Sequence, residues 1–176
     1  MKPEPIVTDR LTLRPPLASD AEGVFEGYAQ DAEVTRYLVW RPHGSIEDTR
    51  RFLDRCRTGW DSGGEYTWTM TVRGSATAVG MVACRPTGHK ADIGYVLARQ
   101  YWNRGYMTEA VKAVVGWAFN LPGMFRVWAV CDVENLASAR VLEKSGMARE
   151  GVLRRWSILP NISYEPRDCF VYAAVR

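Results

Sequence analysis

The segment that most constrains the fold of this chain is residues 95–110, with the sequence YVLARQYWNRGYMTEA. An apolar strand ends near Leu97, a short polar loop with a single glycine, Gly105, follows, and a helix begins at once. The first N–H groups of a helix have no partner within the helix, and the helix dipole favours negative charge there. A strand–loop–helix unit of this kind can hold a pyrophosphate, although an ordinary strand-to-helix turn has the same pattern.

The loop does not match the three better-known phosphate-binding motifs. The dinucleotide fingerprint G-x-G-x-x-G needs three glycines, and here Gly105 stands alone. The chain contains neither a P-loop, G-x-x-x-x-G-K-[ST], nor the glycine-rich loop of protein kinases. The sequence therefore does not indicate any of these three classes of nucleotide-binding protein.

Hydrophobic periodicity and capping residues predict alternating strands and helices. Residues 45–48 form a capping box that opens a helix to about residue 60, while Asn135 and Gly146 are a good N-cap and C′ residue for another helix. Strands are expected at residues 10–14, 66–72, 79–84, 91–97, 125–131, 148–155 and 169–175, and the remaining helices at 19–28, from 31, 108–119 and 136–145.

The order of these parts resembles the GNAT superfamily of N-acetyltransferases. Within that superfamily, the chain resembles the RimJ/RimL branch, which includes ribosomal-protein N-terminal acetyltransferases. No single piece is specific, but the combination is, because it covers nearly the whole chain in the right order. The matching pieces are TDRLTLR at 8–14, IGYVL at 93–97, YWNRGYMTEA at 101–110, NLAS at 135–138 and VLEKSGMAREG at 141–151.

The resemblance implies an α/β (α+β) fold with a central mixed, mostly antiparallel sheet of six or seven strands and about four flanking helices. It also implies that the sheet splays apart between its fourth and fifth strands, and that acetyl-CoA enters this V. The length of 176 residues suits one acetyltransferase domain over residues 1–176.

The resemblance also assigns the site that binds acetyl-CoA. The backbone N–H groups of the loop are expected to wrap the pyrophosphate, with a further bond from the Thr108 hydroxyl. The pantetheine arm is expected to pair like an extra strand with residues 95–97 and to form a hydrogen bond with Asn135. Alternatively, Asn135 serves only as the N-cap of the helix at 136–145; the two roles are compatible. The binding residues are expected to be Tyr95, Val96, Leu97, Asn103, Arg104, Gly105, Tyr106, Met107, Thr108, Asn135 and Ser138.

Acetyl transfer to an amine also needs a proton donor for the departing thiolate and a base for the amine. Ser138 matches a serine near the cofactor sulfur in the RimJ/RimL branch and is expected to be the donor; alternatively, it only caps its helix, and Tyr95 or Tyr106 is the donor. Asp92 is expected to be the base, with Glu65 or a water relay as alternatives; either carboxylate can equally be a surface group without a catalytic role. Trp40 and Trp68 are expected to line the acceptor pocket, or else to be core or rim aromatics.

The chain is therefore predicted to be an acetyl-CoA-dependent N-acetyltransferase in which a primary amine attacks the thioester directly. We expect a protein or peptide N-terminal α-amine as the acceptor, whose ordinary pKa of about 7.7–8.0 leaves a fair fraction already neutral. A small amine (an antibiotic, a polyamine or an amino acid) is the alternative acceptor. A non-catalytic acyl-CoA-binding module is an alternative from a different class.

Composition argues against several other classes. The net charge of +3 is too small to indicate a nucleic-acid surface, and arginine pairs such as Arg50 and Arg51 are typical of solvated surface. Four scattered cysteines without C-x-x-C, and two histidines, predict no metal site. No signal-peptide or membrane-spanning pattern is visible, so we expect a cytoplasmic protein, either a monomer or a homodimer.

Overall fold

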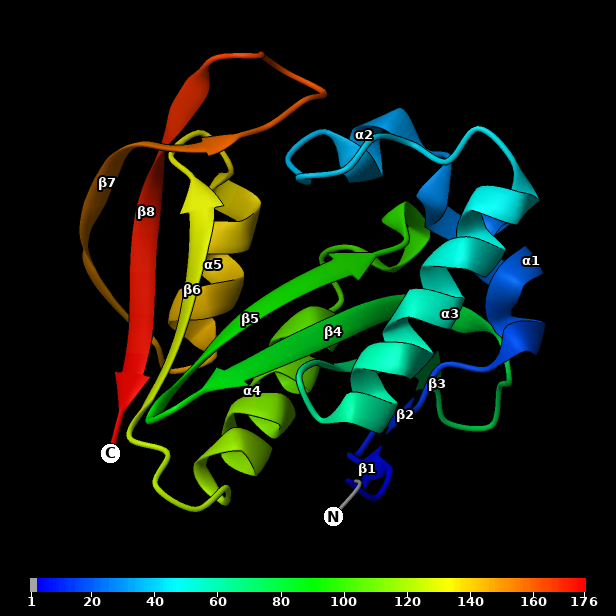
Figure 1. Cartoon of the computed structure of the whole chain (residues 1–176), viewed down its shortest axis with the longest axis horizontal. Coiled ribbons are helices and arrows are strands. Elements are labelled where there is room, and N and C mark those ends of the chain that lie inside the picture. Colours follow the sequence, from blue (N-terminus) through cyan, green and yellow to red (C-terminus); the bar gives the residue numbers. More distant parts are fainter. Residues whose placement is uncertain (1–2) are drawn as a thin grey trace.

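The part of the chain that the structure describes forms a sheet of eight strands in the order β1-β2-β3-β4-β5-β6-β8-β7 (Figure 1). The computed structural model describes residues 3–176. The strands are β1 (Ile6–Val7), β2 (Leu11–Arg14), β3 (Tyr66–Val72), β4 (Ala78–Thr87), β5 (Lys90–Leu97), β6 (Arg126–Asp132), β7 (Ala148–Ile158) and β8 (Pro166–Val175).

Within residues 3–176, five α-helices and three short helical turns connect these strands. The α-helices are α1 (Ala21–Val24), α2 (Ala32–Thr35), α3 (Ile46–Ser62), α4 (Tyr106–Phe119) and α5 (Leu136–Lys144). The turns are η1 (Ala18–Asp20) and η3 (Arg99–Tyr101), both 3-10, and η2 (Phe25–Ala29), a π-helical turn.

The sheet opens into a V between β5 and β6, as the resemblance predicted. Among the described strands these two are the only parallel neighbours, and they pair from Lys90 to Asp92 on β5 and from Arg126 to Trp128 on β6. Beyond Asp92 the strands diverge, as Figure 1 shows from their shared lower end upward. The mostly antiparallel sheet and the splay between the fourth and fifth expected strands are therefore confirmed.

Two details differ from the expectation. The sheet has eight strands rather than six or seven because Ile6–Val7 pairs with β2, and two residues are too few to show an alternating pattern. The segment 19–28 is not one α-helix but the succession η1, α1 and η2. Gly23 and Gly27 lie in this segment, and glycine lowers the intrinsic stability of an α-helix.

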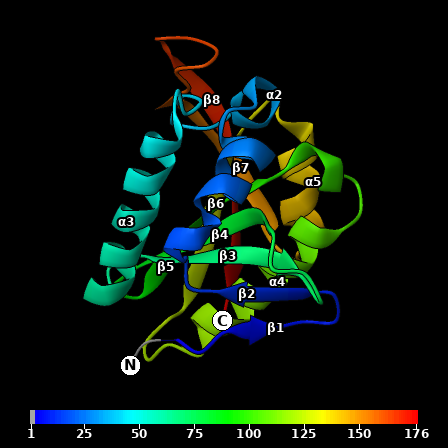
Figure 2. The same cartoon turned by 90° about the vertical axis from the view of Figure 1, so that its right-hand side faces the viewer.

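Helices cover both faces of the sheet (Figure 2). The α1 and α3 helices pack on one face, where a small core contains Val24, Tyr28 and Leu53, while α4 and α5 pack on the other, against the larger core. The predicted apolar stripe of α4 is confirmed, since Val111 and Val114 are wholly buried. Among the described residues, no helix is long and apolar enough to cross a membrane.

Candidate active site

Three segments that are distant in the sequence meet where the V opens. They are the end of β5, the loop that leads into α4, and the start of α5. The Tyr95 hydroxyl lies 2.7 Å from the Ser138 hydroxyl, which joins β5 to α5, and the Ser145 hydroxyl donates to the Thr108 carbonyl at 3.4 Å, which joins α5 to α4. The structure therefore joins the end of β5 to the start of α5, and the residue that follows α5 to the first turn of α4.

The loop before α4 presents a row of free backbone donors. Asn103 and Gly105 have left-handed backbones, with φ of 59° and 77°, and Gly105 is the N-cap of α4 without any side-chain cap bond. Within the described chain, none of the six N–H groups of residues 103–108 donates to a backbone or side-chain acceptor of the protein. Free donors at a helix N-terminus are the usual means of holding a phosphate group.

The N-terminal hairpin holds this loop in place, a role that the sequence did not reveal. The Arg10 guanidinium donates to the Arg104 carbonyl at 2.9 Å and to the Glu109 carboxylate at 2.7 Å. Thr8 donates to the same carboxylate at 2.6 Å, and Arg10 lies 4.7 Å from the centre of the Tyr106 ring. The only available signal was the TDR triplet within the matched N-terminal piece, which has no recognisable local function.

The start of α5 is fixed by a buried carboxylate as well as by its N-cap. The Asn135 side chain accepts from the Ser138 N–H at 3.1 Å, which confirms the predicted cap and leaves the Asn135 amide N–H groups without a protein acceptor in the described residues. Asp132, whose side chain is wholly buried, accepts from Arg167 at 2.6 Å and from the Glu134 N–H at 2.9 Å. The Arg167–Asp132 pair therefore orients the turn that carries Asn135.

Ser138 and Tyr95 form a hydroxyl pair across the V. Burial raises the pKa of Tyr95 well above its ordinary value, so this phenol stays protonated at neutral pH and can donate to the Ser138 oxygen. The Ser138 proton is then free to point at another acceptor. Cys131, which lies close to Ser138, is also buried, and burial raises the pKa of its thiol to about 11, which keeps it protonated.

Asp92 and Glu65 share one arginine. The Arg85 guanidinium donates to the Asp92 carboxylate at 2.8 Å and 2.6 Å, and lies 3.4 Å from the Glu65 carboxylate. Burial works against the charge of Arg85, but the hydrogen bonds and charges of the two acids raise its pKa overall. Asp92 lies at the last paired position before the V opens, and both carboxylates are partly exposed.

The two tryptophans expected at the acceptor pocket have different surroundings. Trp40 is half-buried and packs against His43 and Phe52, with ring centres 5.2 Å and 6.3 Å away. Trp68 has no exposed surface and packs against Trp60 and Trp117 in the main core. The prediction for Trp68 is wrong, because a side chain enclosed by two other indole rings has no surface that could contact an acceptor.

The connection between β7 and β8 reaches across to the segment that precedes α3. The Asn161 amide donates to the carbonyls of Thr35 and Trp40, at 2.7 Å and 2.8 Å. The Arg41 guanidinium donates to the Tyr164 hydroxyl at 3.0 Å. These bonds join the segment before α3 to the second half of the sheet across the mouth of the V, as the upper part of Figure 1 shows.

A splayed mixed sheet with unpaired helix donors beside the splay is the architecture of an acyl-CoA-dependent acetyltransferase. Comparison with known proteins agrees: residues 10–148 match the family model described as an acetyltransferase (GNAT) domain. The chain is similar to the N-acetyltransferase YoaA of Bacillus subtilis, with 31% identity over 96% of this chain and 95% of that protein. The chain therefore belongs to the GNAT acetyltransferase family.

Solved structures show the same fold. The chain is similar to a GNAT-family acetyltransferase from Bacillus anthracis, with a TM-score of 0.84, 30% identity and 98% of each chain covered. It also resembles RimL, a ribosomal α-N-protein acetyltransferase solved in complex with coenzyme A, with a TM-score of 0.85, 20% identity and 98% of each chain covered. Structural neighbours thus include the RimJ/RimL type, and at this identity the likeness to RimL is one of fold.

Proposed function

We propose that this protein transfers the acetyl group of acetyl-CoA to a primary amine, most simply a protein or peptide N-terminal α-amine, and that it acts as one domain. The observation that carries the proposal is the row of six unpartnered N–H groups at residues 103–108, beside the open V. The RimL neighbour with bound coenzyme A supports this choice of donor. Among the described residues, no group of three or more metal-ligating side chains gathers, and the proposed chemistry needs none.

Separate groups of residues bind the pyrophosphate and the pantetheine arm of acetyl-CoA in this proposal. In this proposal the N–H groups of residues 103–108 bind the pyrophosphate, and Gly105 lets the backbone approach it closely. Residues 95–97 of β5 have no strand partner on the β6 side, so their backbone is available to pair with the pantetheine arm. The free Asn135 amide binds the same arm, and an N–H near Val96 or Leu97 polarises the thioester carbonyl.

The chemistry is a direct transfer. The amine nitrogen bonds to the thioester carbon, the C–S bond breaks, and the electron pair of that bond remains on sulfur. Ser138 gives its proton to this sulfur and regains one from solvent, while the Tyr95 hydroxyl holds the Ser138 oxygen in position. Asp92 receives the amine proton, directly or through water. Arg85 holds this carboxylate at 2.6 Å. An α-amine, whose ordinary pKa is lower, needs less help from a base than a lysine amine does.

The acceptor enters on the face that carries α1 and α3, opposite α4 and its phosphate loop. Trp40 and the connection between β7 and β8 border this side. A small amine remains the second candidate acceptor, since the bonds from Asn161 and Arg41 narrow the mouth of the V.

Thiol release from acetyl-CoA tests the proposal. The assay compares N-terminal peptides with small amines, using the wild type, Ser138→Ala and Gly105→Trp. Release with one acceptor class that is lost in Gly105→Trp is expected. Gly88→Trp is the matched control, because Gly88 has a similarly left-handed backbone, with φ of 59°, and open space where a side chain would lie. Coenzyme A binding without release for any acceptor would favour the non-catalytic binding module, and no binding at all would refute both functions.

A further inference from the structure

A pocket of about 310 Å³ lies outside the donor site, between the segment before α3 and the first turns of that helix. Guanidinium groups and aromatic rings dominate its lining. The lining includes Trp40, Arg41, His43, Asp48, Arg51 and Arg55. The pocket combines two kinds of surface, a half-buried aromatic wall and a set of exposed cations.

The pocket carries an excess of positive charge. Three guanidinium groups face one carboxylate, Asp48, which already accepts from the Gly44 and Ser45 N–H groups at 3.0 Å and pairs with Arg51 at 2.5 Å. Arg41 and Arg55 form no ion pair with any residue in the described part of the chain. Two cations therefore remain without a counter-charge in one hollow, although the sequence suggested only solvated surface at Arg51.

The wall of the pocket is rigid. The Trp40, His43 and Phe52 rings pack together with centre distances of 5.2–6.3 Å. The His43 Nδ1 atom lies 2.7 Å from the Thr49 hydroxyl, and the Trp40 carbonyl accepts from Asn161. The arginines thus flank a fixed surface, which lowers the entropic cost of holding a ligand between them.

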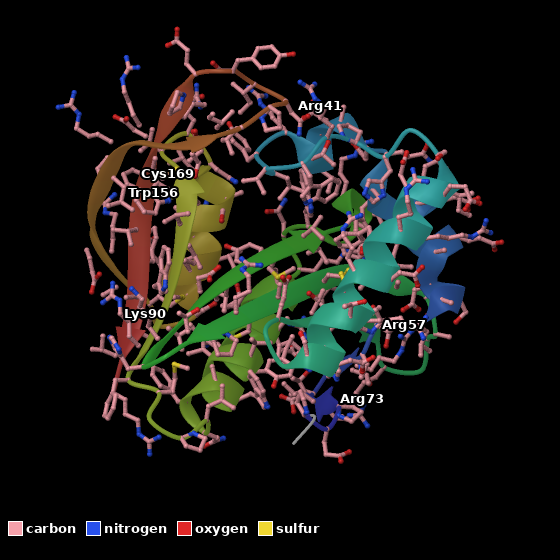
Figure 3. The ribbon with its side chains drawn as sticks, in the orientation of Figure 1. Arg41, Arg57, Arg73, Lys90, Trp156 and Cys169 are labelled. Carbon is pink, nitrogen blue, oxygen red and sulfur yellow. The ribbon has the colours of Figure 1, made fainter. Side chains whose placement is uncertain are left out.

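The pocket adjoins the acceptor side of the V and is separate from the donor loop. Arg41, which lines it, also contacts Tyr164 in the connection that crosses the mouth of the V, and Figure 3 shows Arg41 beside that connection. The α3 helix lies on the face of the sheet opposite α4 (Figure 2). The phosphates expected at the head of α4 therefore lie across the sheet from these arginines.

We propose that this pocket binds an oxyanion, a phosphate or carboxylate group, that the acceptor carries in addition to its amine. Planar guanidinium groups recognise both anions through paired hydrogen bonds, and two unpaired ones beside the acceptor entrance can fix an anionic acceptor with its amine directed into the V. The part of the proposal that assigns this anion to the acceptor rests on the proposed function; the oxyanion site itself does not. A neutral acceptor would leave Arg41 and Arg55 unused.

The test is a titration of the whole protein with inorganic phosphate and, separately, with succinate, followed by NMR of the arginine side chains. Coenzyme A is kept saturating, so that the donor loop is occupied and cannot bind the added anion. Saturable shifts at Arg41, Arg51 and Arg55 are expected. Arg51→Gln/Arg55→Gln should raise the dissociation constant about tenfold, equivalent to about 1.4 kcal/mol.

The control is Arg57→Gln with Arg50→Gln, which removes the same charge from the same helix outside the pocket lining. Arg57 lies further along α3, as labelled in Figure 3. Equal weakening in the control pair, or no saturation with either anion, would overturn the oxyanion site. The preferred anion of the two identifies the group that is bound.

A second experiment tests whether the anion belongs to the acceptor. It uses whichever amine is acetylated in the thiol-release assay. The pocket variant should raise KM for an acceptor that carries the anion and leave KM unchanged for its neutral analogue. An equal KM change for both analogues would overturn the assignment of the anion to the acceptor. If no amine is acetylated, the proposed function fails, while the titration still decides the oxyanion site.

Discussion

Arg10→Gln should weaken the binding of acetyl-CoA while leaving the chemical step unchanged. Arg10 contacts the loop before α4, the proposed pyrophosphate site, through the Arg104 carbonyl, the Glu109 carboxylate and the Tyr106 ring. Without these contacts the loop loses its support from the N-terminal hairpin. The N–H groups of residues 103–108 must then be ordered by the ligand, which costs binding free energy.

The magnitude follows from the contacts. The Arg10–Glu109 pair is partly exposed, 46% and 19%, so solvent screening limits it to about 0–1 kcal/mol. The bond to the Arg104 carbonyl adds about 1 kcal/mol, and the contact with the Tyr106 ring about 0.5 kcal/mol. These contributions total about 1.5–2.5 kcal/mol. If about 1–2 kcal/mol of this total orders the loop, KM for acetyl-CoA should rise about 5- to 30-fold.

The assay is thiol release at saturating acceptor with acetyl-CoA varied, together with calorimetric binding of coenzyme A. Arg73→Gln is the matched control, because Arg73 is an exposed arginine that donates to the Asp9 carbonyl of the same hairpin at 3.2 Å and does not contact the loop. An unchanged KM in Arg10→Gln, or a loss of kcat at constant KM, would refute the reasoning. Arg10→Lys should recover little, because it cannot bond the carbonyl and the carboxylate in the same geometry.

Three further predictions concern the hydroxyl pair, the loop carboxylate and the core. Tyr95→Phe removes the hydroxyl that contacts Ser138, the proposed proton donor, and should lower kcat about tenfold at constant KM for acetyl-CoA; an unchanged kcat would show that the pair has no catalytic role. Burial raises the pKa of Glu109, but hydrogen bonds from Thr8 and Arg10 outweigh it and lower the pKa overall. Glu109 therefore stabilises the fold above its unfolded pKa, and its advantage over Glu109→Gln in urea unfolding should vanish as the pH falls from about 5 to 3. Trp68→Ala should cost about 3–5 kcal/mol of unfolding free energy, and a cost below about 1 kcal/mol would contradict its place in the core.

Features that depend on neighbouring residues could be predicted from the sequence. The Gly105 turn, the Asn135 cap, the capping box at Ser45 and the apolar stripe of α4 all involve residues within a few positions of one another. Backbone preference and helix periodicity decide such features locally. The splay of the sheet was accessible only through the resemblance, because no local pattern states where two parallel strands stop pairing.

The contacts that complete the site depend on tertiary structure. Tyr95 meets Ser138 across 43 positions, and Arg10 meets Glu109 across 99. Such pairs depend on strand order and register, and a shift of one residue would turn Tyr95 to the other face of the sheet. The burial of Trp68 and the gathering of Arg41 with Arg55 likewise arise from packing between elements.

The sequence by itself thus determined the glycine turn before α4 and the helix caps, because short segments with fixed backbone preferences carry that information. The order of motifs along nearly the whole chain indicated the family. Only the tertiary structure decided which side chains support the loop, which hydroxyl partners Ser138 and where unpaired cations collect. The physical reason is that hydrogen bonds and charge interactions act over a few ångströms in space, whatever the separation along the chain.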